Sequence, residues 1–338
     1  MTNLQAVITT IQPPTPAVAA LADRLRPLQA RLIIIGDKKG PASFDLPGAQ
    51  FFSLARQLES PFELARRLPV GHYTRKNVGY LEAIGQGAEC IYETDDDNAP
   101  LVQWRPRDEQ VVVQEVAATG WVNVYRCFSD ERIWPRGLPL DALAESFSKN
   151  IAVGLTEKTV RAPIQQGLAN GSPDVDAIWR LVLDRPFDFN NSPSVLLGPG
   201  AWCPFNSQST WWWPDAYPLL YLPSHCSFRM TDIWRSFIAQ RCLWELGLGV
   251  VFHAPEVFQD RNDHDLMRDF NDEVPGYQRN RELARVLADT PLVAGTGAVA
   301  ANLRRCYEAL VARQFFAPAE LDLVAAWCDG LEQAQRRG

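Results

Sequence analysis

The sequence predicts an α/β protein built on a doubly wound sheet and extended by helices at its C-terminus. Three observations support this prediction. An apolar strand, an amphipathic helix and a second strand follow one another within residues 4–35, which is the start of a doubly wound fold. Residues 32–35 are a continuous apolar run, typical of a strand buried on both faces of a parallel sheet. From residue 273 onward the pattern is helical.

Composition excludes several classes of function. Of the 338 residues, 46% are hydrophobic, and the net charge of −7 argues against a nucleic-acid partner. No apolar run approaches the ~18 residues of a membrane span, and the N-terminus lacks a signal-peptide pattern. The seven cysteines form no CxxC pair. We therefore expect free thiols in a cytoplasmic protein that binds no nucleic acid and has no transmembrane segment.

The first elements are a strand at residues 4–10, a helix at residues 16–30 and the strand at residues 32–35. Thr15 is the expected N-cap of the helix, and Pro27 is expected to shorten its last turn. A third strand and a short helix are expected at residues 50–54 and 61–68.

Polar residues follow the first two strands. Thr9 and Thr10 end the first strand, and Asp37 follows the second. Ligands of doubly wound sheets bind at the carboxyl ends of the strands, so these residues are candidates to contact the base or ribose of a nucleotide. For Asp37, a simple turn before Lys38 is an equally good interpretation.

The stretch of residues 73–98 carries the strongest signal. It begins with a helix for which Thr74 is the expected N-cap. The first helical turn carries Arg75 and Lys76, and their charges together with the free N–H groups suit a phosphate. A short apolar strand follows at residues 90–92.

Three consecutive aspartates, Asp95, Asp96 and Asp97, come directly after that strand. An acidic run alone is usually a solvated loop. A position at the end of a buried strand favours a different interpretation, in which the carboxylates lie at the sheet edge and bind a divalent cation together with a sugar diphosphate. Residues 1–100 would then be a nucleotide-binding half, and residues 101–265 an acceptor half.

The second half is expected to contain strands at residues 110–116 and 120–128. Residues 165–171 have the composition of a loop. Asp174 and Asp176 follow that loop, and two interpretations remain open for them: they contact the sugar, or they cap the next element.

Residues 202–210 (WCPFNSQST) are expected to form a polar and aromatic loop, which is followed by the adjacent tryptophans Trp211, Trp212 and Trp213. Three adjacent side chains cannot all face one core. At least one is therefore expected to line a surface or cleft, where an indole can stack on a sugar. The alternative is a packed cover over the sheet.

Residues 227–247 are expected to contain a helix capped by Thr231 or Asp232, which places Asp232 at the N-terminal end of this helix. A mere capping role is the simpler interpretation of this carboxylate.

His253 follows an expected strand at residues 250–252, with Asp260 and His264 close behind it. A lone histidine is more often structural than a ligand. Its place just past a strand end makes it a candidate for a contact to a metal or a diphosphate.

The C-terminal segment, residues 266–338, is expected to be a helical extension. Its amphipathic helices are expected at residues 279–288, 298–313 and 318–335. We expect them to pack as a helical cap or to form a homo-oligomer interface.

Four motifs, in order, resemble the STELLO-type glycosyltransferases and, more distantly, the reversibly glycosylated polypeptides that act as UDP-arabinopyranose mutases. The similarity covers about the first 260 residues, and the helical tail is not matched. It implies a GT-A fold, a nucleotide-sugar donor such as a UDP-sugar, and Mn²⁺ or Mg²⁺. The motifs are the stretch at 73–98, GLANGSPDVDAIWRL at 167–181, PFNSQST at 204–210 and RMTDIWRSFIAQRCLWELG at 229–247.

The resemblance also implies roles for single residues. Asp95 would face the ribose or the metal, and Asp97 would ligate the metal that bridges both phosphates. Arg75 and Asn77 would line the diphosphate side, and Asp96 would belong to the donor site. Asp232, in the pattern RxxDxW, would be the acidic residue near the acceptor. The remaining residues expected on the acceptor and sugar side are Asp174, Asp176, Asn206, Gln208, Trp212 and Arg229.

Two features depart from the relatives. The arginine that is glycosylated in the mutase-like proteins has no clear counterpart, since only Arg161 lies near, and the sequence shows no membrane anchor. The favoured function is metal-dependent sugar transfer from a nucleotide sugar to a glycan or glycolipid, with Asp232 as general base. The alternatives are a nucleotide-sugar mutase and a non-catalytic nucleotide-sugar-binding scaffold.

Overall fold

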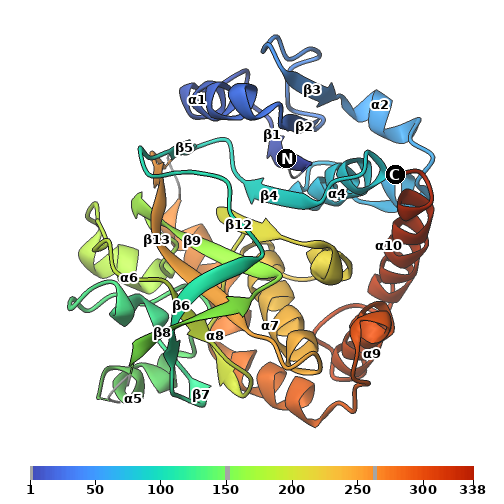
Figure 1. Ribbon diagram of the computed structural model, residues 1–338. Coiled ribbons are helices and arrows are strands. Elements are labelled where there is room, and N and C mark those ends of the chain that lie inside the picture. Colours follow the sequence, from blue (N-terminus) through green and yellow to red (C-terminus); the bar gives the residue numbers. More distant parts are fainter. Residues whose placement is uncertain (1–2, 149–152, 262–264) are drawn as a thin grey trace.

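The computed structural model describes residues 3–148, 153–261 and 265–338. A large mixed sheet forms its centre, with helices on both sides (Figure 1). The strand order among the described residues is β3-β2-β1-β4-β12-β9-β13-β10-β6-β8, and β5 pairs with β13. The expected α/β class with helices at the C-terminus is therefore confirmed.

The first four strands form a parallel half-sheet. Each of them is connected to the next by helix or loop, as predicted for a doubly wound fold. Their bounds are β1 Leu4–Thr10, β2 Arg31–Gly36, β3 Ala49–Phe52 and β4 Cys90–Thr94.

The second half of the sheet is mixed. Strand β12 lies antiparallel between β4 and β9, so β9 and its parallel neighbour β13 run in the same direction as β4. The bounds are β5 Asn98–Pro100, β6 Gln110–Val116, β8 Val153–Arg161, β9 Ile164–Gly171, β10 Val195–Leu197, β12 Ser209–Trp212 and β13 Val250–Gln259. A separate parallel pair consists of β7 Gly120–Trp121 and β11 Ala201–Trp202.

Helices cover both faces of this sheet and build the C-terminal segment. Helix α1 begins at Pro16 behind the N-cap Thr15, whose side chain accepts from the Val18 N–H at 3.2 Å, as predicted. The bounds are α1 Pro16–Leu25, α2 Leu54–Leu58, α3 Glu63–Arg67, α4 Lys76–Gly85, α5 Leu143–Ser148, α6 Ala177–Leu183, α7 Thr231–Trp244, α8 Leu266–Asp289, α9 Val299–Ala312 and α10 Glu320–Gln335.

The tryptophan run lies inside the molecule, so the expectation that one of its indoles lines a cleft is wrong. Trp211 and Trp212 are fully buried and Trp213 is 5% exposed. Strand β12 is a central strand with a core on each face, and successive side chains of a strand point to opposite faces. Trp212 packs into the core beneath α4, α7 and α10, whereas Trp211 and Trp213 pack into the core beneath α1.

The structure corrects several local predictions. Residues 165–171 are not a loop, because they belong to β9, and only Gly120–Trp121 of residues 120–128 form a strand. Thr74 does not cap α4, because a 3₁₀ turn at Tyr73–Arg75 precedes that helix. Helix α7 begins at Thr231 with neither predicted cap, although Asp232 does lie in its first turn.

The C-terminal helices share the core of the sheet domain. Helix α10 packs against α4 near the C-terminus of the chain (Figure 1), and its Trp327 is fully buried against Tyr80 and Tyr221. The Glu320 carboxylate at the start of α10 accepts from the Tyr221 hydroxyl at 2.6 Å and from the His225 N–H at 2.7 Å. The last helices therefore hold the loop that leads into α7. Whether they also form an oligomer interface stays a prediction.

Candidate active site

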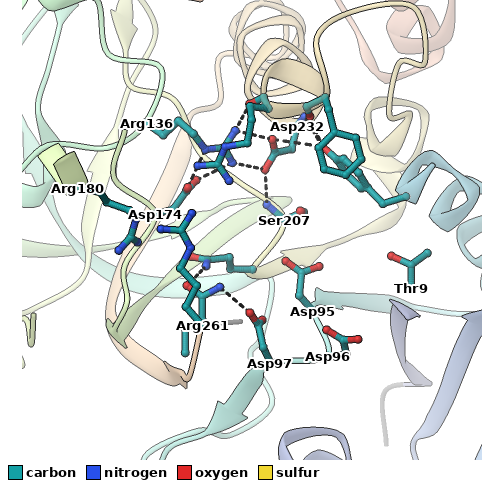
Figure 2. A pocket seen from close by; sticks show the side chains of 15 residues that line it. Thr9, Asp95, Asp96, Asp97, Arg136, Asp174, Arg180, Ser207, Asp232 and Arg261 are labelled. Carbon is teal, nitrogen blue, oxygen red and sulfur yellow. Dashed lines mark hydrogen bonds and ion pairs between the residues drawn. The ribbon is translucent and has the colours of Figure 1, made fainter. Parts of the chain in front are cut away.

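A cavity of about 280 Å³ lies at the carboxyl edge of the sheet. Because β1, β4, β9 and β13 run in the same direction, their carboxyl ends meet at this edge, and β12 begins there. The cavity wall therefore combines residues that are far apart in the sequence, such as Thr9 near the end of β1, Asp97 after β4 and Gln259 at the end of β13 (Figure 2).

The three predicted aspartates all line this cavity. Asp95 forms an ion pair with buried Lys76 at 2.7 Å, Asp96 accepts from the hydroxyl of Thr10, and Asp97 accepts from the Gln259 amide at 2.9 Å. Lys76 therefore contributes to the site, but it does so by holding Asp95.

Negative charge is in excess at these aspartates. Burial raises the pKa values of Asp95 and Asp96, although Lys76 opposes the shift at Asp95. Burial, followed by repulsion from Asp95, raises the pKa of Asp97 to about 7. Such a group of carboxylates favours any ligand that brings positive charge.

Asp232 lies on the opposite wall, where Arg136 binds it. The Arg136 guanidinium donates to Asp232 at 3.0 and 3.1 Å and to Asp174 at 2.7 and 2.9 Å. The Ser207 N–H and the Tyr73 hydroxyl also approach Asp232, at 3.3 and 3.5 Å. Burial, the largest single effect, would raise the pKa of Asp232, but Arg136 together with Arg235 and Arg229 outweighs burial and lowers it. This carboxylate is therefore ionised and weakly basic, which suits a hydrogen-bond acceptor better than a general base.

Three further arginines line the cavity. Arg229 pairs with Glu273 of α8 at 2.9 Å, Arg261 pairs with Asp269 of α8 at 2.6 Å, and Arg180 comes from α6. Arg229 was predicted as a site residue, whereas the side chains of Arg180 and Arg261 add positive charge that the sequence did not suggest.

A second cavity adjoins the first at the ends of β1 and β2. Thr9, Tyr73, Asp96 and Phe228 lie on the walls of both cavities. The second cavity also contains the predicted residues Thr10 and Asp37, and Lys39 beside them. The Asp37 carboxylate accepts from the N–H groups of Gly71 and His72, at 2.8 and 3.0 Å, and so orders the loop that forms one wall.

The structure does not bring every predicted residue to the main cavity. Arg75 is buried and donates to Gln57 and to two carbonyls, although it borders the second cavity. The Asn77 amide binds the backbone of Leu222. Asp176 caps α6 and accepts from the Trp134 indole. Of the two interpretations of this residue, the structure therefore supports the helix cap.

Three more residues of the expected acceptor side differ in their placement. Gln208 lies on the cavity wall, as expected. The Asn206 side chain lies behind that wall, where it binds Gln166 at 2.9 Å. Trp212 donates its indole N–H to Glu93 inside the core at 3.0 Å, far from a position where it could stack on a sugar.

His253 is a core residue, so its prediction as a ligand at a strand end is corrected. Strand β13 continues past it to Gln259, and this glutamine occupies the strand end instead. His253 is fully buried, and its ring nitrogens bind Ser194 at 2.7 Å and Gln165 at 2.9 Å. Burial lowers its pKa well below the usual value. His264 lies outside the described residues.

The residues present fit a divalent cation only in part. No group of three or more histidine, cysteine, aspartate or glutamate side chains among the described residues is arranged to hold a metal. Asp95 and Asp97 nevertheless offer carboxylate oxygens to a solvent-accessible cavity. This donor set matches Mg²⁺, which proteins often bind through one or two carboxylates plus substrate phosphates and water.

The cavity side chains that no sequence pattern indicated are mostly arginines and their partners. Arg136 follows a proline in a turn, and Arg180 is a charged residue within the otherwise apolar sequence of α6, where an arginine is ordinarily a surface residue. Arg261, Ser207 and Tyr73 likewise have no local pattern that marks them. Only the meeting of distant loops at the sheet edge places them in the cavity.

The doubly wound sheet, with a polar cavity at its carboxyl edge, has the architecture of a Rossmann-like glycosyltransferase. Residues 229–335 match the family model of the STELLO glycosyltransferases. The chain therefore carries a domain of the STELLO glycosyltransferase family. The match includes the C-terminal helices, which corrects the expectation that the helical tail is not matched.

Two curated proteins of Arabidopsis thaliana are similar to a larger part of the chain. Probable glycosyltransferase STELLO2 is 34% identical over 247 residues, and Probable glycosyltransferase STELLO1 is 33% identical over 245 residues. Each alignment covers 67% of this chain and 32% of the relative. The chain thus spans about a third of the length of these relatives. Across the described residues, none of the helices has the length and apolar character needed to traverse a bilayer.

Proposed function

We propose that this protein transfers a sugar from a nucleotide-sugar donor, a UDP-sugar, to a hydroxyl of a glycan or glycolipid. The observation that carries the proposal is the group of Asp95, Asp96 and Asp97 with raised pKa values on the wall of a cavity at the carboxyl edge. The family match supports the same class of reaction.

The donor is proposed to lie across both cavities. Its nucleoside occupies the second cavity, beside Thr9, Thr10 and Asp37, and its diphosphate reaches the main cavity past Asp96, which borders both. Mn²⁺ or Mg²⁺ at Asp95 and Asp97 would supply charge that stabilises the departing diphosphate. This placement explains why negative charge is left uncompensated there.

During transfer, the bond from the anomeric carbon to the diphosphate oxygen breaks and a bond to the acceptor oxygen forms. The acceptor hydroxyl gives up its proton to the departing diphosphate, whose anionic oxygen is released in the same step. We assign Asp232 to hydrogen bonding with a sugar or acceptor hydroxyl, because its pairing with Arg136 keeps the carboxylate ionised. This assignment replaces the expected role as general base.

The free state of the seven cysteines fits the proposed cytoplasmic location. The enzyme is proposed to act there on a glycan or glycolipid acceptor. The family match supports an acceptor of sugar transfer in general.

The test is transfer from a panel of UDP-sugars in the presence of Mn²⁺ or Mg²⁺, with glycan and glycolipid acceptors and detection of the product by mass spectrometry. We expect transfer that stops on addition of EDTA and is at least about a hundredfold slower in Asp97→Ala. Asp23→Ala, at an exposed ion pair with Arg26, is the matched control.

Two results would replace the proposal. Binding of UDP-sugars without turnover across the panel would identify a scaffold. A change in the ring form of the donor sugar without any acceptor would identify a mutase.

A further inference from the structure

Apart from Asp174 and Asp232, which Arg136 binds, the charged side chains of the main cavity are separated by sign. Asp95, Asp96 and Asp97 lie at the end of β4, whereas the side chains of Arg180, Arg229 and Arg261 reach the cavity from the second half of the chain. In Figure 2 the labelled Arg180 and Arg261 lie on the side away from Thr9 and Asp96. Thr9 and Asp96 are shared with the second cavity, so the arginines mark the opposite end of the main cavity.

Within the described ranges, Arg180 is a buried cation that forms no ion pair with a carboxylate. Its side chain is 5% exposed, and its Nη2 donates to the carbonyl of Pro173, but its Nε has no hydrogen-bond partner among the described residues. No ion pair joins it to an acidic side chain in the part of the chain that the structure describes. Asp174 is the acidic residue with the strongest effect on it, and this carboxylate is already bound by Arg136.

The neighbouring arginines form their ion pairs with carboxylates that lie outside the cavity wall. Arg229 is paired with Glu273 and Arg261 with Asp269, and both of these carboxylates belong to α8 and lie off the cavity wall. Burial, followed by repulsion from Arg261, lowers the pKa of Arg180 to about 10. An arginine with a pKa shifted in this direction lacks the negative charge that would compensate it.

We propose that Arg180, Arg229 and Arg261 form an oxyanion subsite that binds a phosphate group of a substrate. Guanidinium groups match phosphate oxygens in a planar, bidentate geometry, and a cavity shielded from bulk water strengthens such charge-assisted hydrogen bonds. A phosphate there would supply the negative charge that Arg180 lacks. The phosphate oxygens would also accept hydrogen bonds from the remaining N–H groups of the Arg180 guanidinium.

This proposal deepens the proposed function, on which it rests for the origin of the phosphate. One source is the diphosphate of the donor, which the arginines would then stabilise as it leaves. The other source is a second substrate that carries its own phosphate, such as a lipid-linked or sugar phosphate. Both sources present the same chemistry to the arginines.

The test measures binding by calorimetry with three ligands: inorganic pyrophosphate, UDP and uridine. EDTA is present throughout, so that no divalent cation contributes at the aspartates. Arg180→Met removes the charge and retains much of the side-chain volume, Arg180→Lys retains the charge, and Arg26→Met at an exposed ion pair is the matched control. Because Arg180 is buried and unpaired, Arg180→Met should melt at or above the wild-type temperature.

We expect wild-type protein to bind pyrophosphate and Arg180→Met to bind it at least about tenfold more weakly, with an intermediate effect of Arg180→Lys and unchanged uridine affinity. A parallel loss for UDP would assign the subsite to the diphosphate of the donor. A loss for pyrophosphate alone, without competition by UDP, would assign it to a second, phosphate-bearing substrate. If Arg180→Met does not fold, Arg180→Gln, which keeps a donor for the Pro173 carbonyl, is used in the same titrations.

The proposal is overturned if wild-type protein does not bind pyrophosphate, or if the variant binds both pyrophosphate and UDP within twofold of wild type. These binding results can be distinguished from a failure of the proposed sugar transfer. A protein that transfers no sugar can still bind pyrophosphate through its arginines, and a transferase whose Arg180 serves only the fold would keep its affinity for UDP in the variant.

Discussion

The Arg136 guanidinium binds both carboxylate oxygens of Asp232, from Nη1 to Oδ1 at 3.1 Å and from Nη2 to Oδ2 at 3.0 Å. The same guanidinium binds Asp174, and it also donates to the carbonyl of Arg229. A single side chain thus joins the turn after residue 134, the segment after β9 and the start of α7. It sets the position of two carboxylates on the cavity wall.

Replacement of Arg136 is expected to destabilise the protein strongly. Arg136→Met leaves two nearly buried carboxylates without their cation, which typically costs about 3–5 kcal/mol of unfolding free energy. Arg136→Lys should lose less, because it keeps the charge but not the fork of donors. Urea unfolding measures both effects. An unfolding free energy of Arg136→Met within about 1 kcal/mol of wild type would show that the pair does not hold these segments together.

Asp232→Asn separates the role of hydrogen-bond acceptor from that of general base. The amide accepts more weakly than the carboxylate, so transfer is expected to slow by about tenfold to a hundredfold. Since Arg136 lowers the pKa of Asp232, the pH dependence of kcat/KM between pH 6 and 8 should keep its shape in the variant. Rates measured across this range provide the check. Loss of the acidic limb of the wild-type profile in Asp232→Asn would instead identify Asp232 as the base.

Asp97→Asn is expected to affect stability and ligand binding in opposite directions. Burial and Asp95 disfavour the ionised form of Asp97, so its neutral replacement should stabilise the metal-free protein at pH 7.5 by on the order of 1 kcal/mol. The rise in melting temperature caused by UDP with Mg²⁺ should shrink, because a weaker ligand stabilises the folded state less. Asp23→Asn serves as the control at an exposed site. An undiminished shift with Mg²⁺ and UDP would remove Asp97 from the cation site.

Trp212→Phe tests the place of the tryptophan run in the core. Trp212 is fully buried, and its indole donates to Glu93, so the variant should lose about 1–3 kcal/mol of unfolding free energy. Affinity for UDP and KM for the acceptor should stay within twofold of wild type, because the side chain lies off the cavity wall. Chemical denaturation and steady-state kinetics measure the two effects. A raised KM at unchanged stability would contradict the placement.

Asp176 makes stability depend on pH. Burial raises its folded-state pKa to about 7 from 3.8, so the folded protein keeps a proton that the unfolded chain releases. The unfolding free energy therefore decreases as pH rises from about 4 to 7, and this contribution levels off above pH 7. Asp97 acts in the same direction.

The difference in unfolding free energy between pH 5 and pH 7.5 is therefore expected to shrink in Asp176→Asn, by on the order of 2 kcal/mol. Urea unfolding at the two pH values provides the measurement, and wild-type protein is the reference. An equal difference in the two proteins would show that Asp176 ionises in the folded state as it does in water.

The sequence by itself determined the architecture of the first half-sheet. The order of strands and helices up to β4, the cap at Thr15 and the aspartates after β4 follow from local signals: apolar periodicity, capping residues and polar residues at strand ends. Each of these signals depends only on residues that are close together in the sequence. They are enough to locate Asp95, Asp96 and Asp97 at the sheet edge.

Tertiary structure alone decided which residues form the cavity wall opposite the three aspartates, and which partners single side chains have. Strand β12 enters antiparallel between β4 and β9, and this buries Trp212 and brings Ser207 to the cavity. Arg136 and Arg180 acquire their roles because segments far apart in the sequence meet at one edge. A buried arginine and a surface arginine have the same local pattern, since their difference lies in partners that only the folded chain provides.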